Sequence, residues 1–478
     1  MVEGYIKKSE RKKILLLSDD LRMHSGIATM SRELVVGSSH KYNWFQVGAA
    51  LKHPDHGKVI DISQDVNKNA GINDSDVKVM PNEGYGNSGL VRAIIKKEKP
   101  DALFIFTDPR YWIWLFEIER EIRNKIPIIW LNIWDDYPAP MYNKDYYNSV
   151  DCLMGISKQT VNINKLVLGD DAKDKVINYV PHGINDKHFF PINEDNPLYP
   201  ELIKFKDQTI PHPDIEFLVY FNSRNIHRKR PGDVILAFKL FCDQIGEDAA
   251  KKAGLVMHTE ISNNHGTDLK AVKDALFPQG NVFFSTNKIS SAQMNFMYNM
   301  ADVTVLISSN EGWGLSLTES MMSGTMIVGA VTGGMQDQMR FENEKGEWID
   351  FDSDFPSNHR GTYKKHGEWV EPVFPSNISL TGSPMTPYIY DDRSNPEDVA
   401  AAIKKVYDLP KEERSKRGKA GHDWAKSDEA QMTSAQMCDN MIKSIDETFI
   451  NFKPRPRYEI FKADKAPNTK VTHKLSGY

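Results

Sequence analysis

A chain of 478 residues exceeds the usual size of a single hydrophobic core, so we expect two or more domains. With 40% hydrophobic and 26% charged residues, the composition excludes disordered, collagen-like and membrane-embedded classes. The net charge of -5 argues against nucleic-acid binding through overall charge. The three dispersed cysteines support neither a disulfide framework nor a zinc site.

The N-terminal segment, residues 1–13, is polar and basic, and the apolar run behind it is too short to act as a signal or to cross a membrane. We therefore expect no membrane span and a reducing, cytoplasmic location.

Short apolar runs alternate with helical patterns in residues 1–195, which is typical of a parallel sheet with helices on both faces. The predicted strands are 13–18, 43–48, 102–107, 126–132 and 151–156. A proline-rich stretch, 180–213, follows and is interpreted as a linker that contains the domain boundary.

The same alternation returns in residues 210–425, so the chain is predicted to be α/β with two Rossmann-like domains. The predicted strands of this half are 216–222, 254–257, 281–284, 303–307 and 325–329. An aromatic-rich excursion at 341–390 breaks the pattern and suggests a lid or an acceptor-binding insertion. Residues 428–478 are expected to form a final helix and a basic tail that pack back on the first domain.

The strongest motif covers residues 308–319, between a predicted strand and the helix after it. Glu311 and Glu319 lie on either side of a glycine-containing turn, and the backbone N–H groups of that turn would face a ligand at a helix N-terminus. Such a turn suits a diphosphate and its sugar, an interpretation that we favour over a simple strand-to-helix turn with a surface glutamate. The predicted ligand-binding residues are Glu311, Gly312, Trp313, Gly314, Leu315, Ser316 and Glu319.

A second motif, residues 222–231, follows the first predicted strand of the second half. Its Arg224 and Lys229 suit a pyrophosphate, because guanidinium groups form bidentate contacts and ammonium groups act as point charges. A solvated basic loop is the alternative. The position past the carboxyl end of a strand favours a ligand site.

These motifs resemble those of the retaining GT-B glycosyltransferases, chiefly the family numbered four. The Glu-x7-Glu signature matches Glu311 and Glu319, and the Arg-x4-Lys pair matches Arg224 and Lys229. The turn 25–27 is similar to the family's glycine turn, and residues 181–185 are similar to the turn that closes the N-terminal half. The resemblance covers about residues 13–450, apart from the excursion.

The resemblance implies that Arg224 and Lys229 neutralise the diphosphate, Glu319 holds the ribose and Glu311 holds the transferred sugar. The Gly26 backbone would face the phosphate from the opposite domain. It also implies retention of anomeric configuration, a nucleotide-diphosphate sugar as donor, no protein nucleophile and no metal or other cofactor, because cations and helix N-termini supply the needed charge.

The acceptor side departs from the family pattern. Many members carry a sugar-contacting His in the loop where this chain has Trp134 and Asp135, so we expect one of these to take its place. His24 and Arg110 are further acceptor-side candidates. The aromatic run 111–116 is interpreted first as a buried helix face and second as an acceptor platform.

Three patterns are interpreted as misleading. The G-x-G-x-x-G at 84–89 does not follow the first strand of its domain, from which a dinucleotide site would be expected. The D-x-D at 352–354 lies in the excursion and is interpreted as surface acid. The His-Pro-Asp-His at 53–56 contains a proline that prevents helical alignment of the two rings.

The chain is also similar to glycosyltransferases of large tailed bacteriophages, some of which modify hydroxymethylated bases in their own DNA. A phage-encoded enzyme would act in the host cytoplasm. The tail 453–478, with seven lysines and arginines against two acidic residues, and Arg110 would serve duplex DNA as acceptor. The tail could equally be a solvated terminus.

Other functions remain open at this point. A glycan or lipid could be the acceptor, or the same frame could serve a nucleotide-sugar epimerase or hydrolase. A sugar-binding or scaffold protein is a third class, against which the four charged motif residues argue.

Overall fold

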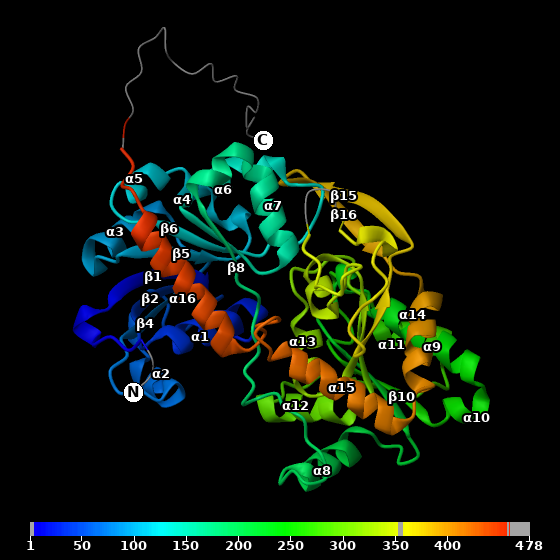
Figure 1. Cartoon of the computed structure of the whole chain (residues 1–478). Helices are drawn as coiled ribbons and strands as arrows, with labels where there is room; N and C mark the ends of the chain where they lie inside the picture. Colours follow the sequence, from blue (N-terminus) through cyan, green and yellow to red (C-terminus); the bar gives the residue numbers. More distant parts are fainter. Residues whose placement is uncertain (1–3, 352–356, 457, 459–478) are drawn as a thin grey trace.

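The computed structural model describes residues 4–351, 357–456 and 458. Within them the chain forms two α/β domains and a peripheral hairpin, as shown in Figure 1. The expected fold of two Rossmann-like domains is confirmed. None of the helices described has the length and apolar character needed to cross a bilayer.

The N-terminal domain is built on a sheet in the order β3-β4-β2-β1-β5-β6-β7-β8, in which all neighbouring strands are parallel except β3 and β4. The strands are β1 Lys12–Asp19, β2 Tyr42–Ala49, β3 Ile60–Asp61, β4 Val77–Asn82, β5 Ala102–Phe106, β6 Ile128–Asn132, β7 Cys152–Gly155 and β8 Val176–Tyr179. The helices are α1 Gly26–Ser38, α2 Ser63–Ala70, α3 Ser88–Glu98, α4 Ile113–Phe116, α5 Glu119–Arg123, α6 Lys144–Asn148 and α7 Lys158–Leu168.

Strand β1 shows why this sheet is buried on both faces. Ile14 and Leu16 belong to one apolar core, and Leu15 and Leu17 belong to the other. Successive side chains of a strand point to opposite faces, so an unbroken apolar run needs cover on both sides. The sheet therefore separates two cores, each closed by helices.

The C-terminal domain contains a parallel sheet in the order β11-β10-β9-β12-β13-β14. The strands are β9 Phe217–Asn222, β10 Ala253–His258, β11 Val282–Ser285, β12 Val303–Leu306, β13 Met326–Ala330 and β14 Val370–Val373. The helices are α8 Tyr199–Thr209, α9 Pro231–Ile245, α10 Glu247–Ala250, α11 Leu269–Leu276, α12 Ser291–Met300, α13 Leu315–Met322, α14 Pro396–Tyr407 and α15 Lys411–Ala425.

Two expectations about irregular segments are corrected. The stretch interpreted as a linker contains α8, where Pro200 stands in the first turn, a position that needs no N–H donor. The excursion is not wholly irregular, because β14 extends the sheet beside β13. It also supplies β15 Asn377–Ser383 and β16 Thr386–Arg393, which pair as an antiparallel hairpin. The aromatic and proline content of this region hid its strands.

The G-x-G-x-x-G at 84–89 lies just after β4, because that strand extends through Pro81 and Asn82. Asn87 then caps α3. Strand β4 lies near the sheet edge, two strands from β1. The motif therefore closes a peripheral turn, away from the first strand of the domain.

The last helix, α16 Ser434–Asn451, returns to the N-terminal domain and lies beside α1. The Tyr42 hydroxyl donates to Asp446 at 2.6 Å, and Asn178 donates to Glu447 at 2.8 Å. These contacts join residues 404 and 269 positions apart in the sequence. The helix thus connects the end of the second domain to the first.

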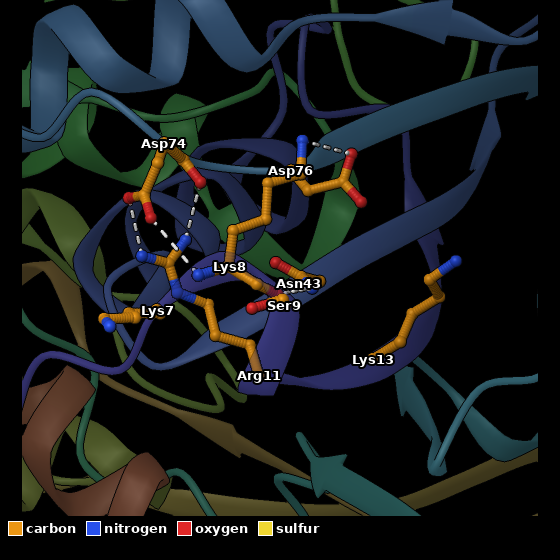
Figure 2. A pocket seen from close by; sticks show the side chains of 8 residues that line it. All are labelled: Lys7, Lys8, Ser9, Arg11, Lys13, Asn43, Asp74 and Asp76. Carbon is orange, nitrogen blue, oxygen red and sulfur yellow. Dashed lines mark hydrogen bonds and ion pairs between the residues drawn. The ribbon is translucent and has the colours of Figure 1, made fainter.

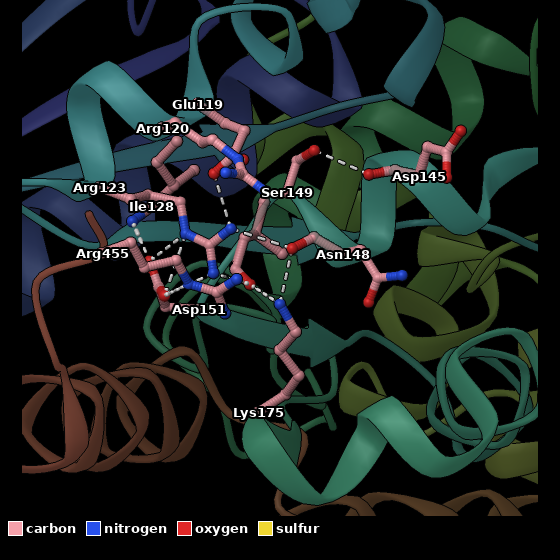
Figure 3. Close-up of polar contacts among 11 residues, drawn as sticks. Glu119, Arg120, Arg123, Ile128, Asp145, Asn148, Ser149, Asp151, Lys175 and Arg455 are labelled. Carbon is pink, nitrogen blue, oxygen red and sulfur yellow. Dashed lines mark hydrogen bonds and ion pairs between the residues drawn. The ribbon is translucent and has the colours of Figure 1, made fainter. Parts of the chain in front are cut away.

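The chain beyond α16 begins on the N-terminal domain, beside the buried Arg123 (Figure 3). The Arg123 guanidinium donates to Asp151 and Glu119, both at 2.8 Å. The backbone carbonyl of Arg123 accepts a hydrogen bond from the Arg455 N–H at 2.9 Å. The Asn124 side chain donates to the Arg455 carbonyl at 2.8 Å. Residues 457 and 459–478 of the basic tail lie outside the described residues, as does the D-x-D at 352–354.

Candidate active site

The two charged motifs meet because β9 and β12 are parallel neighbours, and their carboxyl ends open at the same edge of the sheet. Lys229, in the turn after β9, contacts the Glu311 carboxylate directly. Arg228 lies 3.5 Å from the same carboxylate and donates to the Asn310 carbonyl at 2.7 Å. The amide of Ser309 donates to the Arg228 carbonyl at 2.7 Å, which joins the two loops.

Local backbone geometry presents Lys229 to this site. Residues His227–Lys229 form a short 3-10 turn, Arg230 takes a left-handed conformation with φ of 53°, and Pro231 begins α9. Lys229 is buried, and burial together with the Arg228 cation lowers its pKa, while Asp135 of the other domain opposes that shift. An anionic ligand beside Lys229 would therefore stabilise the charged form of its side chain.

Arg224 is exposed at the edge of the site. In the part of the chain that the structure describes, no ion pair of its guanidinium is present. It therefore differs from Lys229, whose charge is compensated by Glu311. An exposed guanidinium beside a buried ammonium is suited to a ligand with more than one negative charge.

The glycine turn after β12 leads into α13. Gly314 adopts a left-handed conformation with φ of 89°, and the backbone N–H groups at the start of α13 have no partner within the helix. The side chain of Trp313 is buried and donates to Thr318 at 2.9 Å, so Trp313 supports the turn from below. Ser316 is buried as well, and Leu315 is half-buried.

Glu319 lies one turn further along α13 and is held by Tyr298. The Tyr298 hydroxyl donates to the carboxylate at 2.5 Å and accepts from Asn222, at the end of β9, at 2.9 Å. Burial raises the pKa of Glu319 to about 7. The carboxyl is therefore oriented, and it titrates near neutral pH.

The N-terminal domain approaches this turn through Gly26. A Cβ at Gly26 would lie 3.4 Å from the Leu315 side chain, so the start of α1 faces the start of α13. Ser25 caps α1 and donates to Asp19 at 2.5 Å, and Tyr85 donates to the other oxygen of Asp19 at 2.6 Å. His24, beside this turn, is exposed.

The loop after β6 places Asp135, rather than Trp134, at the site. The Trp134 indole is buried, packs against Tyr142 and donates to the Asp136 carbonyl at 2.9 Å. The Trp134 ring belongs to the N-terminal core, and its expected contact with the sugar stays a prediction. A Cβ at Gly312 would lie 3.8 Å from the Asp135 Cβ, which places Asp135 beside the glycine turn.

Asp136 is fully buried next to Asp135, and burial together with that neighbour raises its pKa well above the ordinary value. On the outer side, Arg110 donates to Asp108 at 2.6 Å and to Thr386 of the hairpin at 3.1 Å. The Arg110 charge is thus compensated within its own turn.

Two hollows are lined by residues other than Lys229 and Glu311. One, of about 690 Å³, opens at the amino ends of β1 and β2, where Arg11 pairs with Asp74 at 2.6 Å and Lys8 pairs with Asp76 at 3.5 Å (Figure 2). The other, of about 310 Å³, is lined by the 225–233 loop and by residues of α9 and α11. Within the described residues, no three or more His, Cys, Asp or Glu side chains are grouped to hold a metal ion.

Sequence reasoning missed several residues of this site. Arg228 stood in a predicted motif but was passed over in favour of Arg224 and Lys229. Nothing near Tyr298 or Asp391 in the sequence marks them, because their partners Glu319 and Asn310 lie far along the chain. The basic run 227–230 was the one available signal for Arg228.

Comparison with known proteins supports an assignment to an enzyme class. Residues 203–354 match the family described as Glycosyl transferases group 1. The chain is a glycosyltransferase. The matched segment contains both charged loops, β9 to β13 and α13.

The fold of this glycosyltransferase is similar to solved GT-B structures. HepE of Anabaena, in complex with UDP and glucose, superposes with a TM-score of 0.63 and 11% identity, covering 91% of this chain and 100% of that one. Sucrose-phosphate synthase of Thermosynechococcus elongatus gives a TM-score of 0.62 and 15% identity, covering 92% and 100%. A glycosyltransferase of Rickettsia africae gives 0.61 and 15%, covering 92% and 99%. Among curated proteins, none matches this chain in sequence.

Proposed function

We propose that this glycosyltransferase moves a sugar from a nucleoside diphosphate sugar to a hydroxyl group, with retention of configuration and without a metal. The observation that supports the proposal is the contact of Lys229 with Glu311 beneath the start of α13. Cations, a helix N-terminus and a carboxylate converge there, and these are the groups that a diphosphate and a sugar require.

Donor binding would break the Lys229–Glu311 contact, after which each of the two residues would contact a different part of the ligand. Lys229 and Arg224 would compensate the diphosphate, and the N–H groups at the start of α13 would meet its oxygens. Glu311, released from Lys229, would accept hydrogen bonds from the hydroxyls of the transferred sugar. Glu319, fixed by Tyr298, would accept those of the ribose.

Retention follows from the resemblance to the family numbered four. The acceptor would attack on the face that the diphosphate leaves, and the departing phosphate would take the acceptor proton. The chain's residues would then stabilise charge on the leaving group, a role that we assign to Lys229 and Arg224. Metal independence has the same basis, since those cations provide positive charge at the phosphates.

A uridine nucleotide is the first donor to test. HepE was solved with UDP-glucose, and a trehalose-6-phosphate enzyme of Escherichia coli with UDP-2-fluoro glucose. Both folds cover this chain almost completely, at 91%. We expect the nucleotide of such a donor to lie against β9 to β12 and α13, the elements that carry the two charged loops.

For the acceptor, the described residues favour an uncharged, sugar-like group over duplex DNA. Arg110 and Arg22 are each paired with an aspartate two residues earlier, at 2.6 and 2.7 Å, so neither offers a free charge to a phosphate backbone. The exposed Tyr111 ring lies 4.7 Å from Tyr85 at the same edge of the sheet. Such a ring pair can stack on the apolar face of a sugar.

The test is a thermal-shift screen of UDP, GDP, ADP and their glucose conjugates, each with and without EDTA, followed by product analysis. A shift with one nucleotide that EDTA does not change supports the proposal, and the product's anomeric configuration tests retention. Altered or freed sugar without any acceptor would instead support an epimerase or hydrolase. Loss of the shift in EDTA would contradict metal independence.

A further inference from the structure

Strand β16 lies between the two domains and bonds to both. The backbone N–H of Tyr390 donates to the Tyr137 carbonyl of the N-terminal domain at 2.7 Å. Two residues later, the N–H of Asp392 donates to the Ser309 carbonyl in the loop after β12, at 3.0 Å. The hairpin that contains β16 reaches from the C-terminal domain toward the N-terminal domain in Figure 1.

Other contacts fix the hairpin to the N-terminal domain. The Tyr142 hydroxyl donates to the Tyr388 carbonyl at 3.0 Å, and their rings meet edge to face at 4.8 Å. Arg110 donates to Thr386 at 3.1 Å. The hairpin therefore keeps a defined position relative to the loops after β5 and β6.

Asp392 anchors the same strand to the C-terminal domain. Its buried carboxylate accepts from Thr332, from Ser357 at 2.8 Å and from Asn358 at 2.9 Å. These partners belong to segments that follow β13 and precede β14. Removal of a buried carboxylate with three donors would leave those donors unsatisfied, so Asp392 has a structural role.

Asp391, the neighbour of Asp392, contacts the loops that follow β9 and β12 instead. Its carboxylate accepts from the Asn310 side chain at 3.0 Å and lies 3.6 Å from the Arg230 guanidinium. Arg230 also donates to the Ser309 hydroxyl at 2.7 Å. Asn310 immediately precedes Glu311, so Asp391 holds both loops at the residues next to the Lys229–Glu311 pair.

We propose that Asp391 is a positioning residue that fixes the Asn310–Glu311 segment relative to the N-terminal domain. The inference rests on the proposed function, in which Glu311 binds the transferred sugar. Arg228 holds the Asn310 carbonyl, and Asp391 holds the Asn310 side chain, so loss of Asp391 removes one of the bonds that fix the residue before Glu311. A displacement of about 1 Å in a group that orients a reacting substrate lowers the rate strongly.

The role predicts a separation between nucleotide binding and sugar transfer. The nucleotide would contact Lys229, Arg224 and Glu319, none of which Asp391 touches. The sugar would contact Glu311, whose loop Asp391 fixes. Loss of Asp391 should therefore lower kcat for transfer and leave the Kd for the nucleoside diphosphate nearly unchanged.

The first experiment is hydrogen exchange of the full chain, which needs no donor. Asp391→Ala should raise exchange of the 309–314 segment about tenfold, and Asp391→Asn should stay close to the wild type because its amide oxygen still accepts from Asn310. Asp408→Ala, which removes an exposed carboxylate paired with Lys404, is the matched control. Exchange of Asp391→Ala at the wild-type rate would overturn the proposal.

The second experiment is a double-mutant cycle with Asn310→Ala, using the donor that the nucleotide screen identifies. If Asp391 acts through Asn310, each single variant lowers kcat about tenfold and the double variant lowers it no further. The Kd for the nucleoside diphosphate should stay within about twofold. Additive losses, or equal losses in Kd and kcat, would overturn the proposal.

The two proposals fail separately. A wild-type protein that binds no nucleoside diphosphate would contradict the proposed function, whereas the exchange measurement would still report whether Asp391 fixes the loop. A wild-type protein that transfers sugar and is unaffected by Asp391→Ala would retain the proposed function and remove the positioning role.

Discussion

Lys229 and Glu311 are 82 residues apart in sequence, and their charged ends are in direct contact at the junction of the two domains. Each belongs to a loop at the carboxyl end of a strand, and the two strands are neighbours in one sheet. The pair is the centre of the proposed donor site. A ligand with a diphosphate and a sugar can replace the contact with one new partner for each residue.

Lys229→Ala should lower the turnover of sugar transfer by about 10²-fold or more, because charge that develops on the leaving diphosphate would lose its buried partner. Steady-state kinetics with the donor found by the nucleotide screen measures this. Lys239→Ala, which removes a surface lysine paired with Asp243, is the control and should be unaffected. A near-normal rate for Lys229→Ala would contradict the role.

Nucleotide affinity should depend on the ionisation of Glu319. Its pKa of about 7 means that the carboxyl is largely protonated at pH 6 and ionised at pH 8, and the ionised form accepts hydrogen bonds better. UDP should therefore bind up to about tenfold more tightly at pH 8 than at pH 6, as measured by calorimetry.

Glu319→Gln should bind UDP more weakly and lose that part of the pH dependence. The ionisation of UDP is the same for both proteins, so the difference between their pH profiles reports Glu319. Glu413→Gln, at a half-buried glutamate on the surface helix α15 that is paired with Arg417, is the control. Parallel profiles for wild type and Glu319→Gln would exclude the ribose contact.

Asp337 should make the protein less stable as the pH rises. Its buried carboxyl accepts from the Lys158 N–H at 2.9 Å and the Tyr179 hydroxyl at 3.0 Å, and burial raises its pKa to about 7. Asp350, ion-paired with Lys158, also faces the group and adds to the rise. Between its unfolded value near 4 and about 7, the folded state binds the proton more tightly than the unfolded state, so stability falls over that window.

Asp337→Asn should remove this dependence while keeping an acceptor for both donors. Between pH 5 and pH 7.5 the wild type should lose about 2 kcal/mol more stability than the variant, read from calorimetric melting at each pH. Asp408→Asn is the exposed control. A variant that loses as much stability as the wild type would show that other groups cause the dependence.

Gly312→Ala should slow sugar transfer because it disturbs the contact between the glycine turn and the N-terminal domain. A Cβ there would lie 3.0 Å from the Ile133 carbonyl and 3.1 Å from Ile156, so the turn or the N-terminal domain must shift. We expect a rate loss of about tenfold or more, since small displacements of orienting groups reduce rates strongly. Gly232→Ala, whose new Cβ would lie 3.7 Å from its nearest neighbour, should retain the wild-type rate.

Much of the fold followed from local sequence. The apolar runs predicted β1, β2, β5, β6 and β7 in the first domain and β9 to β13 in the second, within a few residues of their observed ends. Runs of this kind report burial on both faces of a parallel sheet, which is a property of the strand itself. Strand β14 escaped prediction because Glu371 and Pro372 interrupt its apolar pattern.

The sequence by itself determined that charged groups follow β9 and β12, because strand, turn and helix are encoded within about a dozen residues each. Only the tertiary structure decided which of these groups meet. The order of strands in the sheet brings Lys229 to Glu311, and the packing of the N-terminal core buries Trp134 while leaving Asp135 beside the glycine turn. The contact of Asp391 with Asn310 has the same origin, since it joins residues 81 positions apart whose proximity no local pattern records.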